Sequence, residues 1–170
     1  MADARPVETV VERDDGVVFA MRGAGGGAEL PHDLVHLLVE QHLGVTEGIF
    51  GCIADGVVWG SMRHVSGRRP PHWAERSARL TRERAEPLRS AEYLAHVVGR
   101  LARGEPILPG DPARSGQPLP RLREAAAELA AAAERWAALR PGERWTLSWP
   151  AAGGGSSPGR RGAGRGRPPR

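Results

Sequence analysis

Two histidines one helical turn apart are the residues of this chain whose spacing first suggests chemistry. His32 and His36 lie in the segment Pro-His-Asp-Leu-Val-His, which opens an apolar run that continues to Leu43. Residues four apart lie on the same face of a helix, so both imidazoles can point at one ion. Imidazole nitrogen is a ligand that suits a divalent metal such as zinc. The spacing therefore identifies His32 and His36 as candidate metal ligands.

A metal held by this pair needs a third ligand from elsewhere in the chain. Glu40 continues the ridge of His32 and His36 one turn further, and five other side chains offer a nitrogen, oxygen or sulfur donor: Cys52, His64, His72, Glu92 and His96. In the alternative interpretation the pair is structural, with His32 hydrogen-bonded near the helix start and His36 at the edge of the apolar face. The sequence alone favours this structural role over metal binding.

The same stretch resembles a zinc-peptidase motif, because His32, His36 and His42 have the spacing of the metzincin ligands. In that motif a glutamate follows the first histidine and a glycine lets the chain turn back before the third. Here Asp33 and Val39 occupy those positions. If the helix continues through Val39, His42 lies about 15 Å further along the axis than His32. We therefore predict that His42 does not complete a site of the metzincin type.

Composition and charge divide the chain into two parts. We expect residues 1–150 to form a single α+β domain and residues 151–170, rich in Gly, Pro and Arg, to be disordered. All 24 basic residues are arginine, and five of them lie in residues 151–170, which leaves 19 basic and 20 acidic residues in the domain. The lone Cys52 excludes an internal disulfide, and no apolar run approaches the roughly 20 residues of a membrane helix. We expect a soluble, cytoplasmic protein with no membrane partner.

The periodicity of apolar residues predicts an α+β fold, in which a small antiparallel sheet is covered by about four to five helices. The sheet is expected to consist of an N-terminal hairpin, with a turn at Asp14-Asp15-Gly16, and a C-terminal strand over Trp145–Trp149. Arg63–Pro71 is expected to be a basic loop. Ser90 is expected to cap a helix, and the central helix from Pro31 to Leu43 is expected to bury the face formed by Leu34, Val35, Leu38, Val39 and Leu43. The predicted helices are Pro31–Leu43, Thr46–Ala54, Trp73–Glu86, 90–103 and 121–139.

Nucleic-acid binding is a further alternative, with two possible locations. Residues 38–53 resemble a helix-turn-helix motif, with Gly44 in the turn, but the second helix offers no Arg, Asn or Gln to contact base edges. The basic residues 151–170 could hold phosphates loosely, although they include no aromatic residue to stack on bases. The sequence favours a plain helical hairpin and a solvated tail.

The segment from about Leu30 to Ser66 resembles a family of short proteins from high-GC Gram-positive bacteria. The residues that carry the resemblance are Leu30–His36, Leu43-Gly44, Gly48–Gly51 and Ser61-Met62. The family has no known activity, so the resemblance implies a folded domain and transfers no functional residue.

The leading functional hypothesis is a non-enzymatic interaction or accessory domain with a protein partner. The alternative is a metal-binding protein or metal-dependent hydrolase that uses His32 and His36, with a divalent ion such as zinc as cofactor. No catalytic residue is assigned from the sequence, and whether the protein is an enzyme stays open.

Overall fold

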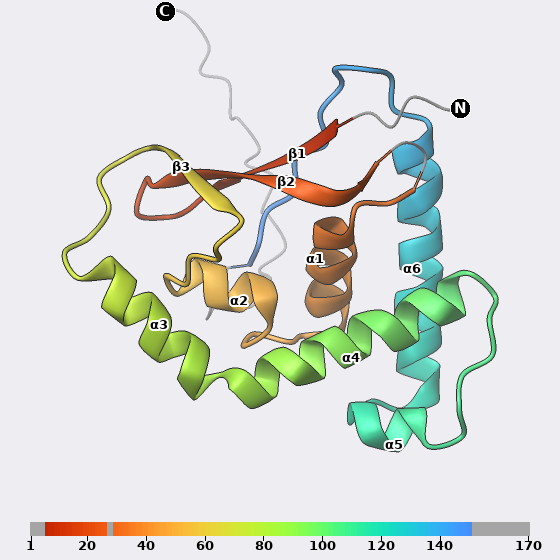
Figure 1. Ribbon diagram of the computed structural model, residues 1–170. Coiled ribbons are helices and arrows are strands. Elements are labelled where there is room, and N and C mark those ends of the chain that lie inside the picture. Colours follow the sequence, from red (N-terminus) through yellow and green to blue (C-terminus); the bar gives the residue numbers. More distant parts are fainter. Residues whose placement is uncertain (1–5, 27–28, 151–170) are drawn as a thin grey trace, which may run out of the picture.

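The computed structural model describes residues 6–26 and 29–150 of the chain. In these residues it has an α+β fold with a three-stranded antiparallel sheet and six helices (Figure 1). The predicted fold class is therefore confirmed. The prediction for residues 151–170 lies outside the described residues. In chain order the elements are β1 (Pro6–Glu12), β2 (Val18–Gly26), α1 (His32–Leu43), α2 (Ile49–Ala54), β3 (Met62–Ser66), α3 (Trp73–Glu83), α4 (Ala85–Ala102), α5 (Asp111–Ser115) and α6 (Leu119–Ala137).

The sheet has the order β1-β2-β3, with β2 in the centre. β1 and β2 form the predicted N-terminal hairpin, and Gly16 in its turn has a φ of 75°, which glycine adopts without a steric penalty. β3 pairs antiparallel with β2, so that Phe19 lies opposite His64. The segment predicted as a basic loop at 63–71 therefore begins with a strand.

The predicted C-terminal strand is wrong, because the third strand is β3 and residues 145–149 form no strand. The alternating pattern at those positions is nevertheless real. Trp145, Leu147 and Trp149 are half-buried, the polar residues between them are exposed, and Leu147 and Trp149 pack on the core beneath the sheet. Period-two alternation reports an extended, half-buried segment but not its backbone pairing. In β3 only Met62 is buried, so its pattern gave no strand signal.

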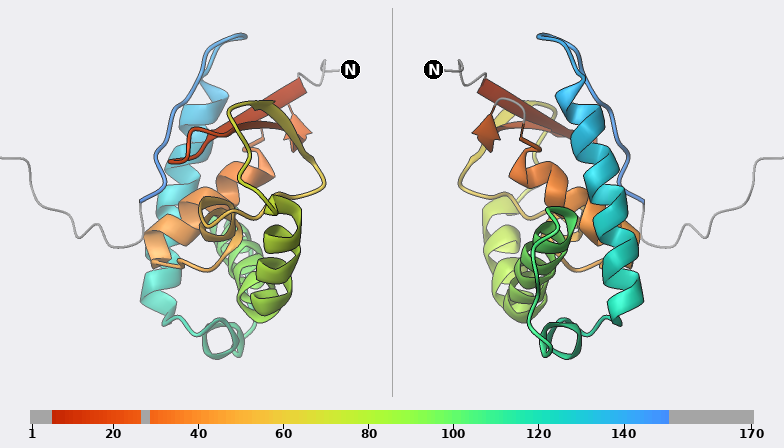
Figure 2. Two further views of the ribbon diagram at one scale, coloured as in Figure 1. Left: turned by 90° about the vertical axis from the view of Figure 1, so that its left-hand side faces the viewer. Right: turned by 90° about the vertical axis from the view of Figure 1, so that its right-hand side faces the viewer.

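α1 is the central element and packs against the sheet, α4 and α6 (Figures 1 and 2). One buried cluster joins α1 to α4 and α6, and a second joins α1 and α2 to the sheet. The first contains Val39, Leu43, Leu94, Val97, Val98, Leu122, Ala125, Ala126 and Leu129. The second contains Val17, Phe19, Met21, Leu37, Phe50, Ile53 and Met62.

The buried face of α1 differs from the predicted one. Leu34, Val35 and Leu38 are half-buried, whereas His36 and Glu40 are almost completely buried. α1 is enclosed by the sheet on one side and by two helices on others, so its polar ridge is covered as well as its apolar one. The predicted end of this helix is confirmed, since Gly44 has the left-handed conformation of a C-terminal cap.

The boundaries of the later helices also differ from the predicted ones. α4 begins at Ala85, so Ser90 lies inside this helix and does not cap it. Arg84 alone separates α3 from α4. The segment predicted as a connector after residue 104 contains the short helix α5.

Asp111 ties α5 and its preceding turn to α4. One carboxylate oxygen accepts a hydrogen bond from Tyr93 Oη at 2.6 Å and the other accepts one from Leu108 N at 2.8 Å. The tyrosine hydroxyl and then the backbone amide hold the pKa of Asp111 below its ordinary value of 3.8.

We expect Asp111→Asn to reduce the loss of stability in acid. Since the pKa of Asp111 is lower in the folded state than in the unfolded state, its contribution is present above the unfolded pKa. It is lost as the pH falls through the folded pKa. The melting temperature of the wild type, followed from neutral pH to below pH ~4, should therefore drop more than that of the variant. Parallel curves would contradict the assignment.

Among residues 6–26 and 29–150, no helix combines the length and hydropathy needed to cross a membrane.

Candidate metal centre

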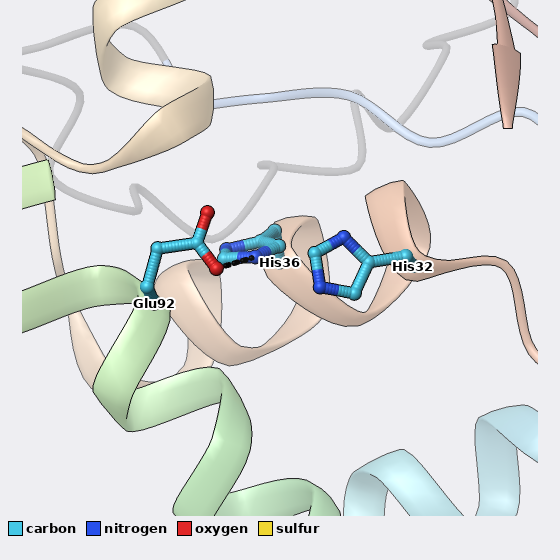
Figure 3. A group of neighbouring side chains, drawn as sticks. All are labelled: His32, His36 and Glu92. Atoms are coloured by element: carbon cyan, nitrogen blue, oxygen red, sulfur yellow. Dashed lines mark ion pairs between the residues drawn. The ribbon is translucent and has the colours of Figure 1, made fainter. Parts of the chain in front are cut away.

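His32, His36 and Glu92 come together where α1 meets α4 (Figure 3). Each residue offers one ligand atom, and these atoms all lie within 4.8 Å of one another. The two histidines come from the first two turns of α1, as predicted, and Glu92 comes from α4. Of the candidate third ligands considered from sequence, Glu92 is the one that lies beside the two histidines.

The distances within the cluster suit a metal ion. His36 Nε2 lies 3.3 Å from Glu92 Oε2, too poorly aligned for a hydrogen bond. Two ligands of a tetrahedral zinc ion, each about 2.0–2.1 Å from the metal, are separated by about 3.3 Å. The His32 ring lies edge-on to the His36 ring at 4.6 Å between centroids. His32 is exposed, so its ring can rotate toward an ion held by the other two.

A second carboxylate lies on the other side of the His36 ring. Glu40 Oε1 is 3.4 Å from His36 Nδ1, and both side chains are at most 2% exposed. In metal sites a carboxylate behind a ligating histidine fixes the ring orientation and the tautomer that leaves the other nitrogen free. Glu40 therefore lies on the Nδ1 side of the ring, opposite Nε2 and Glu92, although neither ring nitrogen makes a hydrogen bond in the described residues.

Glu40 is itself fixed by the start of α2. Its two carboxylate oxygens accept hydrogen bonds from Ile49 N at 2.8 Å and Phe50 N at 3.0 Å, which are otherwise unpaired amides of the first turn. Gly48 provides the space, because a Cβ at this position would lie 2.5 Å from Glu40 Cδ. The two amides that Glu40 caps lie nine and ten residues after it in the sequence. Helix-capping patterns consider only neighbouring residues, so they did not reveal this cap.

The electrostatics of the cluster favour positive charge at its centre. Burial opposes the protonated form of His36 and is the largest single effect on its pKa. Glu40 and Glu92 together outweigh it, so the pKa of His36 is raised above its ordinary value of 6.5. The two carboxylates that favour an imidazolium would equally favour a bound cation.

The other predicted donors lie outside the cluster. α1 is continuous through Val39, so His42 does not approach it, in agreement with the predicted failure of the metzincin pattern. Asp33 is not part of the group, although its Oδ2 is buried without a hydrogen-bond partner in the described residues. Cys52 is a fully buried residue of α2, as expected for a small core side chain. His64, His72 and His96 are likewise outside the group.

The second helix of the candidate helix-turn-helix is α2. α2 is six residues long, and Phe50, Gly51, Cys52 and Ile53 are buried in it. These residues pack into the fold rather than toward solvent.

Comparisons of the chain with protein families, with curated proteins and with solved structures found no match.

Proposed function

We propose that the protein binds one divalent transition-metal ion through His32, His36 and Glu92. The observation that carries the proposal is the separation of 3.3 Å between His36 Nε2 and Glu92 Oε2, in a pair that is not hydrogen-bonded. The carboxylate of Glu40, 3.4 Å from Nδ1, supports it, because metal-binding histidines commonly have a carboxylate on the side of the ring away from the metal.

The donor set favours zinc among common metals. Two imidazole nitrogens and one carboxylate oxygen suit Zn²⁺, whereas Mg²⁺ and Ca²⁺ prefer sites built from oxygen. The Glu92 side chain is 54% exposed, so the site opens to solvent on that side. Three protein ligands leave a fourth position for water, the arrangement by which zinc can activate a water molecule. A metal-dependent hydrolase is therefore the enzyme class that this site would serve.

The interaction-domain and nucleic-acid hypotheses remain predictions. They concern partners, and the site geometry supports metal binding more directly than either.

We expect the purified protein to take up about one zinc per chain, and His32→Ala and Glu92→Gln to weaken the affinity at least about 100-fold, the upper range for outer-shell changes. The measurement is a competition titration with a chromophoric chelator at mildly alkaline pH, where zinc does not have to displace a proton from His36. Both substitutions are at exposed side chains, so the fold should persist.

His96→Ala is the matched control, since His96 lies one turn beyond Glu92 on α4, is exposed, and is outside the cluster. Its zinc affinity should equal that of the wild type. Replacing zinc with Co²⁺ adds a spectroscopic test, because tetrahedral Co²⁺ absorbs strongly in the visible range. Absence of saturable zinc binding, or equal weakening in all three variants, would overturn the proposal. His36 would then be a buried histidine paired with Glu40 and Glu92.

A further inference from the structure

The β1–β2 turn, the loop after β3 and the first turn of α3 lie at the left of Figure 1. Residues of these three segments, with Gly56 and Val58, line a small hollow. The space enclosed in it is small, about 10 Å³, which is room for about one water molecule. Val17 and Phe19 are among the apolar residues that line it, and three arginines, Arg13, Arg69 and Arg76, contribute its charge. None of these residues belongs to the metal cluster.

Two of the arginines converge on a single point. A Cβ built on Gly56 would lie 2.9 Å from Arg76 Nη2 and 3.6 Å from Arg13 Nη2. Gly56 has a φ of 113°, so both its backbone and its surroundings require glycine. The close approach of two guanidinium groups, both positively charged, is unfavourable unless negative charge is nearby.

The hollow contains more positive charge than its acidic neighbours neutralise. Arg13 Nη2 pairs with Asp15 Oδ2 at 2.6 Å, but the Nε of this side chain, which is only 8% exposed, is buried with no hydrogen-bond partner in the described residues. Arg76 donates to the backbone oxygen of Asp55, whose carboxylate is held by Arg84 at 2.6 Å.

Arg69 adds a third guanidinium, which lies 4.5 Å from the centre of the Trp73 ring. Within the described part of the chain, neither Arg69 nor Arg76 takes part in an ion pair with a carboxylate. Two of the three arginines are therefore free to contact an anion.

The N-terminus of α3 adds to the positive electrostatic potential of the hollow. α3 begins at Trp73 with no side-chain cap for the amides of its first turn, and the residue before it, His72, has an unusual φ of 54°. Uncapped amides and the helix dipole favour an anion at this end. Trp73 and Arg76, one turn apart on this helix, both line the hollow.

We propose that this hollow is a binding site for the phosphate group of a small phosphomonoester, held by Arg13, Arg69 and Arg76. Guanidinium groups pair with phosphate oxygens through two parallel hydrogen bonds, and the Nη2 atoms of Arg13 and Arg76 converge beside Gly56. The enclosed space of about 10 Å³ is far below the roughly 300–1,000 Å³ of pockets that enclose whole ligands. The phosphate group would therefore lie at the open side of the hollow, against the guanidinium groups, with the rest of the ligand in solvent.

The test is a titration of the full chain with inorganic phosphate and with phenyl phosphate, at constant ionic strength and followed by NMR. The indole N–H signal of Trp73, assigned through Trp73→Phe, should shift saturably. Arg69→Ala and Arg76→Ala should each weaken both ligands by about tenfold or more, the loss typical of a charge-assisted hydrogen bond. Arg69 and Arg76 are exposed, so their replacement leaves the core intact.

Arg79→Ala is the matched control on the next turn of α3, because Arg79 is exposed, pairs loosely with Glu83 and does not line the hollow. Its affinity for phosphate should be unchanged. The titration repeated with His32→Ala should also be unchanged, which separates this site from phosphate bound to a metal. No saturable shift, equal losses in all three arginine variants, or binding of inorganic phosphate but not phenyl phosphate would overturn the proposal.

Discussion

Replacing Glu40 by alanine should lower the free energy of unfolding by about 3–5 kcal/mol, the cost of removing one member of a buried charged network. The side chain is 1% exposed and accepts two backbone hydrogen bonds at the start of α2. The truncation would leave the amides of Ile49 and Phe50 buried without acceptors and remove one carboxylate beside His36. Urea unfolding followed by circular dichroism measures the change.

Two further variants define the cause of this loss. Glu40→Gln keeps the shape and one oxygen acceptor, so its cost should fall between those of the wild type and Glu40→Ala. Glu124→Ala on the exposed side of α6 removes a carboxylate with no recorded partner in the described residues and should change stability by less than about 0.5 kcal/mol. A loss below about 1 kcal/mol for Glu40→Ala would contradict the cap.

The second large effect is expected for Leu122→Ala, which should cost about 2–5 kcal/mol. Leu122 is fully buried in the cluster that joins α6 to α1 and α4. Removing three methylene-sized groups there leaves a cavity in the cluster where α1, α4 and α6 meet.

Arg123→Ala is the neighbouring control, since Arg123 is exposed on the same helix. It should cost less than about 0.5 kcal/mol in the same urea experiment. Similar losses for the two variants would show that the assignment of the faces of α6 is wrong.

The sequence predicted those parts of the fold that depend on local signals. The hairpin turn at Gly16 and the end of α1 at Gly44 both rest on glycine in a left-handed conformation, a preference that a single residue expresses. The stripe of Leu122, Ala125 and Leu129 predicted the buried face of α6 in the same way.

The parts that failed depend on pairing between distant segments. β3 carries mostly exposed side chains and is a strand because its backbone completes the sheet beside β2. The segment over Trp145–Trp149 has the alternation of a strand but lies on the core without joining the sheet. Side-chain patterns describe burial, and backbone pairing requires knowledge of the partner.

Only part of the candidate metal centre could be predicted from the sequence. The spacing of His32 and His36 is local and identified two members of the cluster. Glu92 lies more than fifty residues away on α4, so it could be included only as one of several donors. The role of Glu40 could not be predicted, because it depends on α2 folding back so that its first amides meet the carboxylate.

The contact between Glu40 and Gly48 means that these two positions cannot vary independently. Any side chain at 48 would occupy the volume of the carboxylate at 40, and any shorter residue at 40 would leave the start of α2 without its acceptors. Homologues that keep the site should therefore share the spacing His-x3-His-x3-Glu-x7-Gly, even where the rest of the chain has diverged. Those that lose the glycine should lose the glutamate with it.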